Sequence, residues 1–298
     1  MRVQLQLRIV GDDDTVISDD EVLHFEKIDD RLEVIGLSLD EAKTLLEQVQ
    51  QRLVATQVAT YMSRHRCCPA CGGTLRSKGR GRIRFRTAFG IVPLPSPRFH
   101  RCGCQPMDAK TFSPLAELFT EHTAPELLYL ETKWASLVSY GMTVDLLRDV
   151  LPIGALAHAS TVRNHLHRVA ARHDAELGDE RSYFIEGCPA DWKDLPVPEG
   201  PIVVGIDGGY VRDWTDKQSN FEVIVGKSMP EDRDDRYFGF VQTLDAKPRR
   251  RLFEVLRGQG FQMNQDITFL TDGGDDVRDL ATDMSPCAEH VLDWFRAT

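Results

Sequence analysis

The chain has 298 residues, of which 42% are hydrophobic and 28% charged, and its formal net charge is −10. Its length allows two or three domains with their own cores, and its composition is that of an ordinary soluble protein. It has no apolar run as long as a membrane span, and its first residues lack the pattern of a signal peptide. We therefore expect a cytoplasmic protein, whose seven cysteines serve as metal ligands or isolated thiols rather than disulfides.

Residues 3–36 alternate weakly between apolar and polar side chains, which predicts a small β meander. Ser38 can then cap a helix from Leu39 to His65, whose first turn carries acidic residues against the helix dipole. We expect the apolar face of this helix to pack on the meander, and dimerisation is the alternative. The residues of that face are Ala42, Leu45, Leu46, Val49 and Leu53, widened by Val54 and Val58.

Two cysteine pairs lie about thirty residues apart. The first is in CPACGG, whose turn lets two thiolates face one ion while the glycines free amides to donate to sulfur. The second is in HRCGC, with one residue between the cysteines instead of the usual two, so His100 and Cys67 are alternative ligands. The pattern predicts structural Zn²⁺ in a zinc ribbon, and a set of buried thiols is the alternative. The predicted ligands are Cys68, Cys71, Cys102 and Cys104.

Between Met62 and Cys104 there are ten basic residues and no acidic one, although the chain as a whole is acidic. The segment RIRFR alternates arginine with Ile83 and Phe85, so it predicts a hairpin strand with one basic face. Such a face binds phosphates with steep salt dependence and without reading base sequence. A merely solvated basic face is the alternative. The arginines predicted to bind DNA are Arg80, Arg82, Arg84 and Arg86.

From Pro125 the chain is predicted to be helical. Gly141 separates the first helix from a second that begins at Thr143, and Ser160 caps a third. This arrangement fits a helix-turn-helix, and an ordinary three-helix bundle fits equally well. The residues predicted to contact DNA are Thr161, Arg163 and Asn164, at the start of the third helix. Its histidines are expected to be solvated; they are His158, His165, His167 and His173.

Residues 187–200 are rich in proline and polar residues, so we expect a linker there. Beyond it the pattern predicts three strands, a helix, a strand, a helix and a strand, the order of an RNase H-like core. The first and fourth strands end on Asp207 and Asp272, each followed by two glycines. Two carboxylates at one rim of a sheet would share Mg²⁺ or Mn²⁺, whereas two turn residues are the alternative. The nineteen acidic and twelve basic residues from Glu199 onward favour a metal site there.

The predicted fold is therefore a multidomain α+β and α/β chain. Its segments are an N-terminal ββα region (1–65), a zinc ribbon (66–106), a helical helix-turn-helix-like region (107–186), a linker (187–200) and a partial RNase H-like core (201–298). With these segments in view, the chain resembles bacterial insertion-sequence transposases of the DDE type, most closely the ISKra-like group, which is related to Mutator-like transposases. The residues that carry the resemblance are CPACGG, RTAFG, HASTVRNHLHRV, VVGIDGGYVR, FLTDGGDDVRDL and EHVLDWF.

The resemblance implies that Asp207 and Asp272 hold paired Mg²⁺ ions during DNA strand cleavage and transfer. It also implies a homo-oligomer that binds double-stranded DNA at the terminal repeats of its element. The family's third acid, usually a glutamate beyond the fifth strand, has no counterpart, because Glu289 and Asp293 lie before or on that strand. We therefore expect a truncated, cleavage-deficient transposase. A DNA-binding regulator that competes with intact transposase is the alternative, and a host nuclease is disfavoured.

Overall fold

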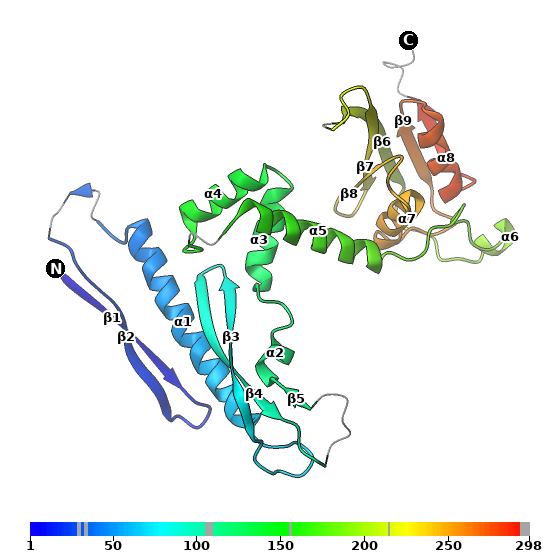
Figure 1. Ribbon diagram of the computed structural model, residues 1–298. Coiled ribbons are helices and arrows are strands. Elements are labelled where there is room, and N and C mark those ends of the chain that lie inside the picture. Colours follow the sequence, from blue (N-terminus) through cyan, green and yellow to red (C-terminus); the bar gives the residue numbers. More distant parts are fainter. Residues whose placement is uncertain (29–30, 33–34, 105–109, 155–156, 214, 293–298) are drawn as a thin grey trace. The chain divides into compact units, whose positions relative to one another are not determined.

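The computed structural model describes residues 1–28, 31–32, 35–104, 110–154, 157–213 and 215–292 (Figure 1). The chain divides into two compact units, Met1–Ala171 and Arg172–Thr298. The division lies inside helix α5 (Ala159–Glu176), whereas the sequence predicts the main linker at residues 187–200. The first unit has two hydrophobic clusters and the second has one.

The first unit begins with an antiparallel hairpin of β1 (Arg2–Val10) and β2 (Val16–Glu26). The residues described between Glu26 and Leu39 form no further strand, so the described part of the predicted meander is a two-stranded hairpin. A lone hairpin is marginal in water, and this one packs along the following helix through ion pairs such as Lys27–Glu41, whose atoms are 2.7 Å apart.

Helix α1 (Leu39–Arg64) starts where the sequence predicts. The Glu41 amide donates to Ser38 Oγ at 3.2 Å, and the Ser38 amide donates to the Glu41 carboxylate at 2.8 Å, so a complete capping box satisfies two free donors. Of the predicted apolar face, Val54 and Val58 are buried together with Met62, whereas Leu46 and Leu53 are 40% and 37% exposed. Val54 and Val58 pack on the hairpin that follows the helix rather than on the meander, so the expected packing partner is wrong for them.

The buried face of α1 packs on a second hairpin, made of β3 (Ser77–Thr87) and β4 (Gly90–His100). Ile83 and Phe85 of β3 pair with Leu94 and Val92 of β4 on the inner face of this hairpin. The alternation predicted from RIRFR is thus confirmed. The short strand β5 (Thr111–Phe112) and helix α2 (Pro114–Leu118) complete this core.

Three helices form the second cluster of the first unit: α3 (Pro125–Ala135), α4 (Tyr140–Val150) and the start of α5. Leu127, Leu147 and Val162 are buried at its centre. The predicted boundary between the first two helices is wrong, because Ser139 caps α4 and Gly141 lies inside its first turn. Serine is among the strongest N-cap residues, so the helix starts at Tyr140, three residues before Thr143.

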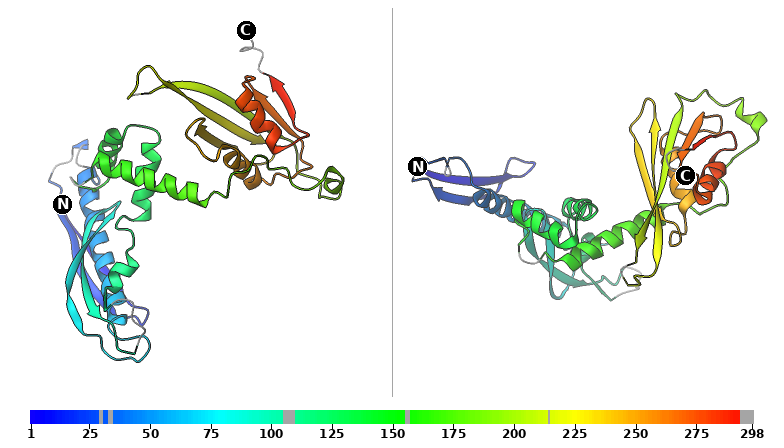
Figure 2. Two further views of the ribbon diagram at one scale, coloured as in Figure 1. Left: turned by 45° about the vertical axis from the view of Figure 1, so that its right-hand side comes forward. Right: turned by 90° about the horizontal axis from the view of Figure 1, so that it is seen from above.

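The second unit is built on one five-stranded sheet in the order β10-β9-β6-β7-β8. Its elements follow the predicted order of three strands, helix, strand, helix and strand, and Figure 2 shows this sheet and its helices, coloured from yellow to red, in two further views. Strands β6, β9 and β10 are parallel, and β7 and β8 are antiparallel to their neighbours. The bounds are β6 (Ile202–Arg212), β7 (Asn220–Pro230), β8 (Arg236–Val241), α7 (Pro248–Gly258), β9 (Ile267–Thr271), α8 (Asp275–Met284) and β10 (Glu289–Leu292).

Helices α7 and α8 cover one face of this sheet, where Val204 and Phe269 are fully buried against Leu252 and Met284. The opposite face is open, and Val225 is 52% exposed on it. Residues before the sheet belong to the same core, because Phe184 is buried in it.

The segment predicted as a linker contains helix α6 (Pro189–Trp192). Its Trp192 is buried, and the indole N–H donates to the carbonyl of Glu186 at 2.8 Å. This part of the predicted linker is thus ordered structure within the second unit. None of the helices described in either unit combines the length and the apolar character of a membrane-crossing segment.

Candidate metal centres and nucleic-acid interface

The four cysteines predicted as ligands lie together at the base of the β3–β4 hairpin. The Sγ atoms of Cys68 and Cys104 are 3.5 Å apart, as are those of Cys71 and Cys102, and all four lie within 4.8 Å of one another. Four thiolates around Zn²⁺, each about 2.3 Å from the ion, would be roughly 3.8 Å apart. The cluster could therefore hold a metal ion such as zinc, with soft donors that suit it.

Two tight turns bring these sulfur atoms together. The first turn is closed by the Cys68 amide, which donates to the Gly73 carbonyl at 2.8 Å, and by the Gly72 amide, which donates to the Cys68 carbonyl at 2.9 Å. Gly72 has φ +70°, a conformation that favours glycine. Neither Cys67 nor His100 belongs to the cluster among the residues that the structure describes. The geometry thus favours the four-cysteine set over the two alternative ligands.

Backbone amides and neighbouring thiols set the charges of the cluster. The amide of Cys71, and then that of Ala70, lowers the pKa of the Cys68 thiol to about 7. The thiol of Cys102, and then that of Cys68, raises the pKa of Cys104 to about 12. Without a cation, thiolate charge is therefore favoured at Cys68 and disfavoured at Cys104. A bound divalent ion would remove this repulsion, because thiolates are the form that binds metals.

The basic face of the hairpin is exposed, as the sequence predicts. Arg80, Arg82 and Arg84 lie opposite Pro97, Pro95 and Pro93 on the outer face. Proline has no backbone N–H to donate to a further strand, so the part of β4 that carries these prolines resists β pairing with another chain. Within the described part of the chain, no ion pair engages these three guanidinium groups. Their positive charge is available to an anionic partner.

Arg86 differs from the other three arginines. Its side chain is only 18% exposed, and its Nη2 atom lies 3.1 Å from Oε1 of Glu131, whose side chain is fully buried in α3. The other carboxylate oxygen of Glu131 contacts Nδ1 of His165 in α5. His165 is therefore buried and paired, although the sequence predicts a solvated histidine. Glu131 recurs four residues after buried Leu127, and this position on an apolar stripe is the signal that could have revealed it.

The residues predicted to contact DNA from the third helix lie in the first turns of α5. Arg163 and Asn164 are exposed, and Thr161 is half-buried. Val162, between them, is fully buried against α3 and α4. This spacing presents two polar side chains to solvent from a helix that is anchored on its opposite side.

Asp207 and Asp272 lie at equivalent positions on neighbouring parallel strands. Strands β6 and β9 pair in a register that ends at Ile206 opposite Thr271, and each aspartate is the next residue of its chain segment. Neighbouring strands are about 4.8 Å apart. The two side chains belong to one hollow of about 530 Å³ on the open face of the sheet, in which Asp207 is exposed and Asp272 half-buried. The sequence predicted which two strands lie side by side, but Asp207 does not end its strand, because Gly208 and Gly209 pair with β7 and β6 continues to Arg212. Asp272 does follow the end of β9.

The hollow also contains Lys227 of β7. Its amino group lies 2.6 Å from the Asp235 carboxylate, which raises the pKa of Lys227. The positive charge beside the two aspartates is thus already paired. Of the other acids considered from the sequence, Glu289 begins β10, where Thr268 Oγ1 donates to it at 3.3 Å, and Asp293 lies outside the described residues.

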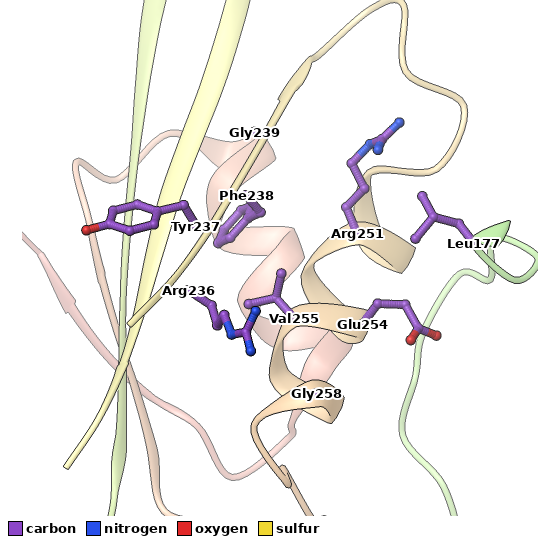
Figure 3. A pocket seen from close by; sticks show the side chains of 9 residues that line it. All are labelled: Leu177, Arg236, Tyr237, Phe238, Gly239, Arg251, Glu254, Val255 and Gly258. Carbon is purple, nitrogen blue, oxygen red and sulfur yellow. The ribbon is translucent and has the colours of Figure 1, made fainter. Parts of the chain in front are cut away.

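A separate pocket of about 510 Å³ lies between β8 and α7 (Figure 3). It includes Arg236 and Arg251, but neither aspartate of the open face. Arg251 is paired with Asp174, at 2.6 Å, and with Asp245. Its charge therefore stabilises the packing of α7 rather than marking an anion site. Comparison of the chain with protein-family models and with curated proteins found no match.

Proposed function

We propose that this protein binds double-stranded DNA through the β3–β4 hairpin and the start of α5, and that its second unit is an RNase H-like core of the DDE transposase type. The observation that carries the core assignment is the register of β6 and β9, which puts Asp207 and Asp272 side by side at one hollow. In such a core the first and fourth strands carry the first two acids. In chain order, β6 and β9 are the first and fourth strands of this sheet, and they are neighbours within it. The DNA-binding part is supported by the exposed arginine face of β3.

Asp207 and Asp272 would hold Mg²⁺ or Mn²⁺ through carboxylate oxygens, the donors that these ions prefer. When bound, the ion would activate a water or a DNA 3′-hydroxyl and stabilise the leaving oxygen. In the first unit, Cys68, Cys71, Cys102 and Cys104 would hold Zn²⁺ as a structural ion. That ion would fix the base of the hairpin and thereby orient its arginine face.

A DNA-binding regulator without strand-transfer activity is the second candidate. It is favoured by the composition of the open-face hollow, where Asp207 and Asp272 are the acids among its lining residues. Phosphoryl transfer depends on accurate metal placement, which two carboxylates support less well than three. Such a regulator would compete with intact transposase for the same DNA ends.

The DNA-binding proposal is tested by removing charge from the hairpin. Each phosphate contact contributes about 0.9 to the slope of log affinity against log salt, so Arg80→Gln with Arg82→Gln should lower the slope by up to about 1.8 on a mixed-sequence duplex. The matched control is Arg2→Gln with Arg8→Gln, which changes net charge equally at arginines that already pair with Glu26 and Asp19. Equal effects of the two double variants would refute a binding role for the hairpin.

Strand transfer separates the two candidates. The wild-type chain is incubated with Mn²⁺ and DNA carrying the sequences that flank its gene, and joined products are counted. Joining that is lost in Asp207→Asn identifies a transposase. Tight binding of those ends without joining identifies the regulator.

A further inference from the structure

Glu131 has 0% exposure, the least of the charged side chains that the structure describes in the first unit. Neither the cysteine site nor the proposed DNA contacts involve it. It contacts two cationic or potentially cationic groups from different elements. Oε1 accepts from Arg86 Nη2 of β3 at 3.1 Å, and Oε2 contacts His165 Nδ1 of α5. A buried carboxylate is costly unless it is paired, so this cluster holds the three elements in one arrangement.

The backbone reinforces the same junction. The Arg86 amide donates to the carbonyl of His122 at 2.8 Å, and the Ala124 amide donates to the Arg86 carbonyl at 2.7 Å. The end of the arginine strand is thereby joined to the residues that start α3. Glu131 then extends this connection by one side chain to α5. The junction therefore links the exposed hairpin arginines to the exposed start of α5.

We propose that Glu131 is a positioning residue, which fixes the hairpin face of Arg80, Arg82 and Arg84 relative to Arg163 and Asn164 so that both contact one duplex as a single body. This inference rests on the proposed DNA-binding function. Two linked sites that engage together gain about 10² to 10⁴ in affinity over either alone, and the gain is lost when the geometry is wrong. Glu131 acts through this geometry, without touching DNA.

The proposal is testable because it predicts the opposite effect of Glu131→Gln on DNA affinity from the one expected from net charge alone. Glu131→Gln removes a negative charge and releases the Arg86 guanidinium, so charge alone would strengthen phosphate binding and steepen the salt dependence. If Glu131 positions the two faces, the same substitution weakens binding, by at least about tenfold, because the two faces no longer engage one duplex together. The sign of the change decides between the two.

The experiment measures affinity for a 30-base-pair mixed-sequence duplex across a salt series, with the zinc-loaded full chain. Glu131→Gln is compared with the double variant Glu131→Gln, Arg86→Gln, in which two amides can hydrogen-bond and the pair is neutral as in the wild type. Glu121→Gln is the matched control. This substitution likewise releases an arginine, Arg168 of α5, which lies 3.1 Å from Glu121, but the two side chains are 50% and 40% exposed, whereas the Glu131 side chain is fully buried.

The expected pattern is weaker binding by Glu131→Gln, binding within about threefold of wild type by the double variant, and unchanged or tighter binding by Glu121→Gln. Equal or tighter binding by folded Glu131→Gln would overturn the inference. If that variant does not fold, the double variant decides alone, and a folded double variant that binds weakly overturns it. A wild-type chain that binds no duplex would instead refute the proposed function.

Discussion

Replacing one predicted zinc ligand should release zinc from the base of the β3–β4 hairpin and lower the stability of the first unit. Cys71→Ser removes a thiolate whose sulfur lies 3.5 Å from that of Cys102. Cys67→Ser is the matched control, since Cys67 is also exposed and is four residues away but lies outside the cluster. The two variants therefore differ in metal ligation and not in the kind of side chain that is changed.

The size of the effect follows from the ligand set. Structural zinc in small domains contributes an apparent 10 to 16 kcal/mol, or roughly 3 kcal/mol for each of four thiolates. The cluster is part of a hydrophobic core, in which Cys68 is 2% exposed and packs with Leu75 and Phe99. For a unit of this size, about 3 kcal/mol lowers the melting temperature by roughly 6 to 12 °C.

The assay combines zinc content of the purified protein with a thermal melt. Wild type and Cys67→Ser should each hold one zinc per chain and melt together. Cys71→Ser should lose most of its zinc and melt earlier in the transition of the first unit. If Cys71→Ser keeps its zinc and its melting temperature, or if Cys67→Ser loses as much, the four-cysteine site is wrong.

Two further results are expected. Zinc affinity should rise with pH and fall below about pH 7, because metal binding needs thiolates and the pKa values of Cys68 and Cys104 are about 7 and about 12. Zinc titration at several pH values, with measured proton release, checks this. A zinc affinity that does not depend on pH would contradict it. Gly226→Ala should destabilise the second unit by about 1 to 3 kcal/mol, because a Cβ there overlaps the buried Phe238 ring, whereas Gly209→Ala, with open space around it, should change stability by less than about 0.5 kcal/mol in urea unfolding.

Features whose signals are local in the chain could be predicted from the sequence. The capping box at Ser38 needs residues three apart, and the helix begins at Leu39 as predicted. The two aspartates could be placed because each comes after an apolar run and before two glycines, although Asp207 lies inside β6 rather than at its end. Their equivalent register then follows from parallel pairing of the two strands.

Features that depend on which surfaces pack together could not be predicted, because the periodicity of a sequence does not determine the packing partner of a helix face. Helix α1 has apolar residues around much of its circumference, so Leu46 and Leu53 were predicted to share one buried face with Val54 and Val58, although the two leucines are exposed and the two valines are buried. Glu131 and His165 are 34 residues apart, and each alone is typical of a solvated helix. The segment around Trp192 has the composition of a linker, yet it is ordered, because its polar groups form hydrogen bonds within the second unit.

The shared carboxylate site is tested most directly by crystals grown with Mn²⁺ and measured for anomalous scattering. The expected result is a peak within about 2 Å of carboxylate oxygens of both Asp207 and Asp272, which disappears in Asp207→Asn. Carboxylates more than about 10 Å apart, with no peak between them, are too distant to bind one ion and would contradict a common metal site.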